Sequence, residues 1–283
     1  MKISTEIGSA SRIIGEEKAV EYVAKAGFDA WDFTLSPMLK YEWPSKIPSQ
    51  TDHPLSGSNY LQFARKLKKI GEDNGIHCNQ SHAPHPTGIH ILDWLKRSVE
   101  CTAEAGGKIC IIHPANDLSA EENAEMYNLL LPFAKACGVK IATENMYGWN
   151  PEKDCASPAA CCTPKDFNAH LDAVNDPDFV ACLDLGHAEM RGINTSATEM
   201  IYALGDRLKT LHIHDNDRHK DSHQIPFSMD IDYTAIVKAL KDINYQGYLT
   251  LEAYKYLTAY DAETAFRGIK NLADSAKKFS DMF

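Results

Sequence analysis

Strand-like and helix-like segments alternate eight times along this chain, and this alternation restricts its fold more than any other feature of the sequence. The expected strands cover residues 3–8, 28–34, 76–82, 108–113, 139–145, 179–185, 208–213 and 247–253. The expected helices cover residues 16–26, 59–74, 90–105, 119–137, 164–174, 196–204, 233–243 and 260–279. Regular alternation predicts an α/β protein with a parallel sheet. Eight such units in about 250 residues predict a closed (β/α)8 barrel.

A doubly wound open sheet is the main alternative architecture. Such a sheet usually begins with a glycine-rich phosphate loop after its first strand. Here that turn reads GSASRIIG, which lacks the expected glycine spacing. No linker separates two halves of the chain, so residues 1–283 are expected to form a single barrel domain.

Composition and charge limit the cellular setting and the partners. The chain is 44% hydrophobic and 24% charged, as in ordinary globular proteins. Neither a signal peptide nor an apolar run of membrane-spanning length is evident, so no membrane partner is expected. Eight cysteines without a secretory leader indicate reduced thiols and a cytoplasmic protein. The formal net charge of −10 disfavours a nucleic-acid partner, while a homo-oligomer is compatible with the sequence.

The later strands carry titratable residues at or just beyond their C-terminal ends, which is where barrel enzymes build their active sites. The densest stretch, residues 212–223, begins at the end of the expected strand 208–213 and reads HIHDNDRHKDSH. Side chains alternate along a strand, so Asp184, His212 and Glu252 are expected on the inward face. In chain order, the residues at strand ends are His82, His113, Glu144, Asp184, His187, His212, Asp221, His223 and Glu252.

Carboxylates gathered at one end of a barrel would repel one another, and some would have to take up protons. A divalent metal ion removes this repulsion and suits mixed imidazole and carboxylate ligands. We therefore expect the chain to bind a divalent metal. Zinc or manganese is the first expectation, and cobalt and magnesium also accept such ligands.

The motifs at these strand ends read, in chain order, SHAP, IIHP, TEN, CLDLGH, LHIHDND, DSH and LTLEA. In this order they resemble the xylose isomerase-like TIM barrel superfamily over essentially the whole chain. That superfamily includes sugar-phosphate isomerases and epimerases, ketose 3-epimerases, inositol-catabolism enzymes and the endonuclease IV type of abasic-site nuclease. The resemblance implies a metal-dependent enzyme and does not select one substrate.

The ketose 3-epimerase type implies a single metal held by Glu144, Asp184, His212 and Glu252. In that type, the residues matching Glu144 and Glu252 also exchange protons with the substrate carbon, one on each face. His187 of the DLGH motif and Arg218 would contact substrate oxygens. His214 lies two positions after the ligand histidine and shares its inward face; it contacts substrate, supports the ligands from behind or lies in a solvated loop.

The endonuclease type implies additional ligands, because its members hold up to three zinc ions. The matching positions are His82, His113, His187, Asp221 and His223. In an isomerase, these residues would instead shape the pocket, bind an accessory metal or hold substrate oxygens, and His82 and His113 are substrate-binding candidates. The run SMDID replaces the glycine-rich turn that is usual after the DSH-like motif, which leaves the shape of the substrate rim open.

Long loops are expected at residues 36–58 and 147–163. Loops of this length are usually functional or mobile. Trp43 and Trp149 lie in them and either cover a sugar face or hold the loops in place. The second loop also contains Cys155, Cys161 and Cys162, whose spacing is not CxxC, so they are expected to be free thiols rather than zinc ligands.

The first function hypothesis is a metal-dependent isomerase or epimerase acting on a small sugar, sugar phosphate or polyol. Either Glu144 or Glu252 would take a proton from the carbon beside a metal-bound carbonyl, and the other would return one. An inosose dehydratase-like lyase would use the same groups. The alternatives are a zinc phosphodiesterase for abasic DNA and a barrel that binds without turnover. Loop 36–58 carries two lysines and no arginine, which argues against DNA.

Overall fold

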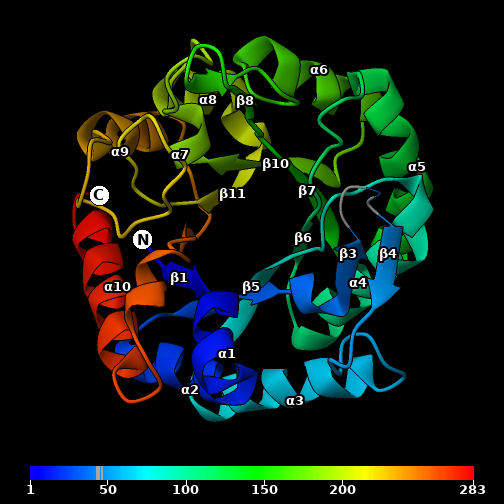
Figure 1. Cartoon of the computed structure of the whole chain (residues 1–283), viewed down its shortest axis with the longest axis vertical. Helices are drawn as coiled ribbons and strands as arrows, with labels where there is room; N and C mark the ends of the chain where they lie inside the picture. Colours follow the sequence, from blue (N-terminus) through cyan, green and yellow to red (C-terminus); the bar gives the residue numbers. More distant parts are fainter. Residues whose placement is uncertain (43–44, 46) are drawn as a thin grey trace.

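Eight parallel strands form the centre of the molecule and are surrounded by helices (Figure 1). This computed structural model describes residues 1–42, 45 and 47–283, so Trp43 lies outside the described residues. A parallel bridge from Ile213 to Leu251 joins the two edge strands, and the predicted closed barrel is therefore confirmed. In sheet order the strands are β11 (Leu208–His212), β10 (Phe179–Asp184), β7 (Lys140–Glu144), β6 (Ile109–Ile111), β5 (His77–His82), β2 (Ala30–Thr34), β1 (Ile3–Glu6) and β12 (Leu249–Leu251).

The helices pack around the outside of the barrel because each presents an apolar face to the strands (Figure 1). Local signals set several helix starts: Ser119 forms a capping box with Glu122, and Asp232 caps the helix that begins at Tyr233. The helices are α1 (Gly8–Ile14), α2 (Glu16–Ala26), α3 (Tyr60–Asp73), α4 (Leu92–Ala105), α5 (Ala120–Ala136), α6 (Pro164–Val174), α7 (Leu185–Ala188), α8 (Ala197–Leu204), α9 (Tyr233–Asp242) and α10 (Ala265–Ser280). None of the helices in the described part of the chain is long and apolar enough to cross a membrane.

The structure differs from the sequence expectation in the segments that connect the barrel elements. Helix α1 follows β1 directly, and its first residue, Gly8, lies so close to β2 that a Cβ atom there would be 2.7 Å from Thr34 Cγ2. Both expected loops contain antiparallel hairpins: β3 (Leu39–Glu42) with β4 (Ile47–Gln50), and β8 (Gly148–Asn150) with β9 (Cys155–Ser157). These hairpins are short, so they left little periodic signal in the sequence.

The barrel interior below the C-terminal strand ends is polar on one side. The Gln80 amide oxygen accepts hydrogen bonds from Asn79, Thr210 and Thr250. Its amide nitrogen donates to Asp32 Oδ2 at 2.9 Å. The other side is filled by Ile111, Ala142, Val180 and Cys182. The polar side thus fixes the position of a buried carboxylate, Asp32, directly beneath the strand ends.

Candidate metal centre and active site

Four predicted ligands from four different strands converge at the C-terminal end of the barrel. One potential ligand atom from each lies within 4.8 Å of the others: Glu144, Asp184, His212 and Glu252. The first three end β7, β10 and β11, and the fourth follows β12. His212 Nδ1 lies 2.9 Å from Glu144 Oε1 and 3.8 Å from Glu252 Oε2. Parallel strands in register therefore bring together carboxylates and an imidazole that are far apart in the sequence.

His212 is oriented by Asp32, a residue that the sequence analysis did not select. The Nε2–H group of His212 donates to Asp32 Oδ2 at 3.2 Å, and both side chains are fully buried. Nδ1 of His212 faces Glu144 Oε1 at 2.9 Å and is the ring nitrogen that would bind a metal ion after losing its proton. A carboxylate on the far nitrogen of a ligating histidine fixes its tautomer and raises its basicity. The position of Asp32 near the C-terminal end of the second expected strand was the sequence feature that could have indicated this role.

The buried carboxylates fit a divalent metal ion because several of their oxygens lack other partners. Among the described residues, no hydrogen bond reaches Glu144 Oε2, Asp184 Oδ2 or Asp221 Oδ1. A buried acceptor left unsatisfied costs about 1–3 kcal/mol, and more when charged. A cation held between these oxygens and the neighbouring imidazoles would satisfy them.

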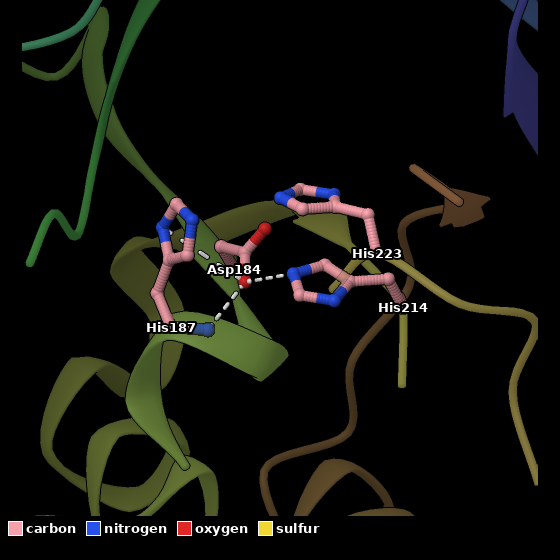
Figure 2. Close-up of side chains that lie close together, drawn as sticks. All are labelled: Asp184, His187, His214 and His223. Carbon is pink, nitrogen blue, oxygen red and sulfur yellow. Dashed lines mark hydrogen bonds and ion pairs between the residues drawn. The ribbon is translucent and has the colours of Figure 1, made fainter. Parts of the chain in front are cut away.

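A second group of ligand-type side chains adjoins the first and shares Asp184 with it (Figure 2). Asp184 Oδ1 accepts hydrogen bonds from the His187 backbone N–H at 2.7 Å and from His214 Nε2 at 3.1 Å. The His223 ring stacks on His214, with centroids 3.7 Å apart. Asp221 Oδ2 lies 2.9 Å from His223 Nε2 and 3.5 Å from His187 Nε2.

Gly186 makes room for the His214 ring. A Cβ atom at Gly186 would lie 2.0 Å from His214 Cε1 and 2.4 Å from His214 Nε2. The ring fills this space and is fully buried against Asp184. The glycine of the DLGH motif is thus required by a histidine that lies one strand away.

A third group lies on the other side of Glu144. His82 Nδ1–H donates to the Ala83 carbonyl at 2.9 Å, which directs His82 Nε2 towards His113 Nε2, 2.8 Å away. Glu144 Oε2 lies 3.6 Å from His82 Nε2 and 3.3 Å from His113 Nε2. This geometry places three potential ligand atoms around one point and makes Glu144 common to two groups.

The surroundings shift the pKa values of the two glutamates of the central group in opposite directions. Burial raises the pKa of Glu252 to about 7, with repulsion from Glu144 adding to the effect and attraction to His212 opposing it. Burial would also raise the pKa of Glu144, but His212 and the neighbouring imidazoles of His113 and His82 hold it well below its usual value. Carboxyl pairs whose pKa values are driven apart in this way are typical of acid–base sites.

A cavity of about 560 Å³ opens above these groups. Its wall includes His82, His113, Glu144, His187, Asp221, His223 and Glu252. The β8–β9 hairpin contributes Gly148 and Trp149 to the rim, and the Trp149 ring contacts His219 with centroids 5.5 Å apart. The cavity is of the size usual for small-molecule sites, roughly 300–1,000 Å³.

Two predicted substrate contacts lie elsewhere. The Arg218 guanidinium donates to Glu189 Oε2 at 2.7 Å, and Arg218 is not among the described residues that line the cavity. His214 is fully buried behind Asp184, so it supports the ligand groups instead of lying in a solvated loop or facing the cavity. In the β8–β9 segment, the thiols of Cys155, Cys161 and Cys162 are free.

Comparison with known proteins connects this geometry to one family. The family model described as xylose isomerase-like TIM barrel matches residues 20–275. The uncharacterized protein y4fM of Sinorhizobium fredii is 42% identical, over 71% of this chain and 75% of that protein. The probable endonuclease 4 of Mesoplasma florum is 24% identical, over 84% of this chain and 86% of that protein.

Solved structures with the same fold include several sugar epimerases. A D-tagatose 3-epimerase-like protein has a TM-score of 0.71 at 17% identity, with 99% of both chains covered. D-Psicose 3-epimerase has a TM-score of 0.70 at 16% identity, covering 99% of this chain and 98% of the other. The 3-keto-D-glucoside 4-epimerase from E. coli has a TM-score of 0.69 at 17% identity, with 99% of both chains covered.

Proposed function

The chain belongs to the xylose isomerase-like TIM barrel family, and on that basis we propose that it is a divalent metal-dependent isomerase or epimerase of a small carbohydrate. The observation that carries the proposal is the pair Glu144 and Glu252. Both line the same cavity; burial raises the pKa of Glu252, while the neighbouring imidazoles lower the pKa of Glu144. A reaction that removes a proton from one face of a carbon and returns it to the other needs such a pair.

The central group would hold the metal through Glu144, Asp184, His212 and Glu252. A divalent ion bound there would supply positive charge beside a substrate carbonyl, which would make the proton on the adjacent carbon easier to remove. Zinc and manganese are the first candidates, since the donors are imidazole and carboxylate.

The chain's own residues would move the proton. Glu144 is ionised, so its carboxylate accepts the proton from the substrate carbon. Glu252 would return a proton to the opposite face of that carbon. Burial raises its pKa to about 7, so this carboxyl group takes up and releases protons readily near neutral pH. In the reverse direction the two carboxyl groups exchange roles. His187, which lines the cavity and whose Nδ1–H donates to the Asn145 carbonyl at 2.9 Å, would position a substrate hydroxyl through Nε2.

The groups around this centre would have supporting roles. His82 and His113 face the cavity and would hold substrate oxygens or an accessory metal. Asp221 and His223 line the same cavity, and His223 belongs to a group with Asp184, His187 and His214 that would hold an accessory metal. Arg218 is excluded from direct substrate contact in this conformation by its pairing with Glu189.

A metal-dependent phosphodiesterase for abasic DNA is the second candidate, because one specific observation favours it. The ligand-type residues form three adjoining groups joined through Glu144 and Asp184, as a site for three metal ions would require. The charge of the chain argues against this function, since the formal net charge is −10 and Arg12 is the single lysine or arginine among the described residues lining the cavity. Binding to DNA relies on neutralising its phosphates with cations.

One assay separates the two candidates. Protein loaded with Mn²⁺ or Zn²⁺ is incubated with a panel of ketoses and keto-glycosides, and separately with plasmid that contains abasic sites. The proposal expects a new sugar stereoisomer or aldose–ketose product and intact plasmid. Nicked plasmid without conversion of any sugar would replace the proposal with the hydrolase.

A further inference from the structure

A second pocket adjoins the central cavity at the mouth of the barrel. It has a volume of about 830 Å³ and lies between the segment that follows β5 and the segment that follows β6. The two pockets share three lining residues: His85, His113 and Met146. His85 is exposed and its ring stacks on His113, with centroids 5.0 Å apart, so it forms the ridge between the two spaces.

We propose that the substrate is a glycoside or another two-part carbohydrate. The reacting sugar unit occupies the central cavity, and a second, uncharged unit occupies this adjoining pocket. The inference rests on the proposed function and specifies the substrate class of that same site. Both volumes lie within the range of roughly 300–1,000 Å³ that is usual for small-molecule sites, so each space accommodates a separate part of the ligand.

The charges around the adjoining pocket exclude a phosphate there. Its acidic lining residues are Asp117, Glu122 and Glu125, and no lysine or arginine lines it within the described part of the chain. A phosphate or a nucleic-acid backbone placed among these carboxylates would meet like charge at close range. Neutral hydroxyl groups, by contrast, donate hydrogen bonds to carboxylates.

The remaining surface of the pocket suits a sugar ring. Ile89 and Leu118 line this pocket and are exposed to 51% and 41%. They offer an apolar surface to the C–H face of a ring. Asn116, Asp117 and Glu125 are also exposed and can receive hydroxyl groups. A pocket with apolar patches and a few polar groups is the usual form of a small-molecule site.

The walls of the pocket are held in place before any ligand binds. Tyr41 Oη donates to the Pro86 carbonyl at 2.8 Å, which ties the β3–β4 hairpin to the wall. Thr87 Oγ1 donates to the His113 carbonyl at 2.6 Å and joins the two wall segments. The Ala115 N–H donates to Asn123 Oδ1 at 2.8 Å. Ligand binding to a preformed pocket costs less free energy, because the pocket walls do not have to become ordered on binding.

The inference is tested by binding, which does not require turnover. Wild-type, metal-loaded protein is titrated with D-fructose, D-fructose 6-phosphate and the ketose disaccharides isomaltulose and turanose, with saturation-transfer NMR recorded for each. At least one disaccharide is expected to bind about tenfold more tightly than fructose, since its second ring adds contact area, with saturation reaching both rings. Fructose 6-phosphate is expected to gain nothing over fructose.

Two variants fill the adjoining pocket, and a third is the control. Ile89→Trp and Leu118→Trp add bulk at exposed positions of the pocket, while Leu129→Trp adds the same bulk on α5, where Leu129 is 53% exposed. The first two are expected to weaken disaccharide binding about tenfold and leave fructose binding unchanged, because only the second ring is displaced. The control is expected to bind both sugars as wild type does.

The results that would overturn this inference differ from those that would overturn the proposed function. Disaccharides that bind no better than fructose, pocket variants that weaken both sugars equally, or preferred binding of fructose 6-phosphate would each overturn the two-part substrate. Exchange of a sugar C–H proton with solvent is followed in the same samples. Its absence from every sugar, with the expected binding pattern intact, would overturn the proposed catalysis and leave the two-part binding site standing.

Discussion

Replacement of Asp32 by asparagine tests how the structure prepares a metal ligand. Asp32 is fully buried, and its Oδ2 accepts hydrogen bonds from His212 Nε2 at 3.2 Å and Gln80 Nε2 at 2.9 Å. The asparagine carbonyl can take the place of Oδ2 and keep both hydrogen bonds. The substitution therefore removes the negative charge behind His212 and leaves the shape of the site unchanged.

The expected loss follows from that geometry. A hydrogen bond to a charged group contributes about 1.5–3 kcal/mol, and mutation of the partner behind a metal ligand typically weakens metal affinity about 10- to 100-fold. We expect Asp32→Asn to lose metal affinity within this range. The asparagine NH₂ group would occupy the position of Asp32 Oδ1, which has no partner among the described residues. An unsatisfied buried donor costs about 1–3 kcal/mol of folding stability, so the melting temperature should also fall.

Calorimetric titration of metal-stripped protein with Mn²⁺ at pH 8 measures the affinity, and a thermal melt without metal measures the stability. Asp172→Asn is the matched control, because it makes the same chemical change at a side chain that is 72% exposed and paired with Arg207 on the surface. It should bind metal as wild type does. A folded Asp32→Asn protein whose affinity lies within about twofold of wild type would refute the assigned role of Asp32.

Three further predictions concern other parts of the site. Gly186→Ala should lower the melting temperature and displace His214, because the new Cβ would lie 2.0 Å from His214 Cε1. Overpacking of this kind costs about 1–3 kcal/mol of folding stability, and a melting curve identical to that of wild type would contradict this prediction. Metal affinity should rise as the pH is raised towards 7, because Glu252 has a pKa of about 7 and must lose its proton to bind metal. Calorimetry in two buffers should find that metal binding releases more protons at pH 6 than at pH 8. Equal proton release at the two pH values would contradict this role of Glu252. Glu144→Gln should lower turnover at least about a hundredfold. His223→Ala should weaken substrate or accessory-metal binding and lower turnover less than that, and equal losses of turnover in the two variants would favour the multi-metal hydrolase.

The barrel and the convergence of the central ligands could be predicted from the sequence because both depend on simple periodicities. Eight alternating segments specify the strands, and parallel strands bring all their C-terminal ends to one face. Glu144, Asp184 and His212 each end a strand, so their positions in the sequence determine their positions in space. Long-range pairings between strands were not needed for that inference.

The features of the structure that could not be predicted from the sequence depend on contacts between residues that are far apart in the chain. Asp32 ends no motif and becomes significant only because β2 lies across the barrel from His212. Arg218 follows the ligand histidine at the expected distance, yet its backbone lies in the left-handed region with φ 60° and its side chain pairs with Glu189. Both hairpins and α1 were missed because short elements depend on tertiary packing more than on local pattern.

The central claim is that Glu144 and Glu252 transfer a proton at a substrate carbon. It is tested most directly by incubating metal-loaded protein with the ketose and keto-glycoside panel in D₂O and following each C–H signal by NMR. The account predicts deuterium at a carbon next to the carbonyl of at least one sugar, and at least about a hundredfold slower incorporation in Glu252→Gln protein shown by calorimetry to retain metal. Stereochemical conversion without any deuterium incorporation, or equal incorporation in the Glu252→Gln protein, would contradict it.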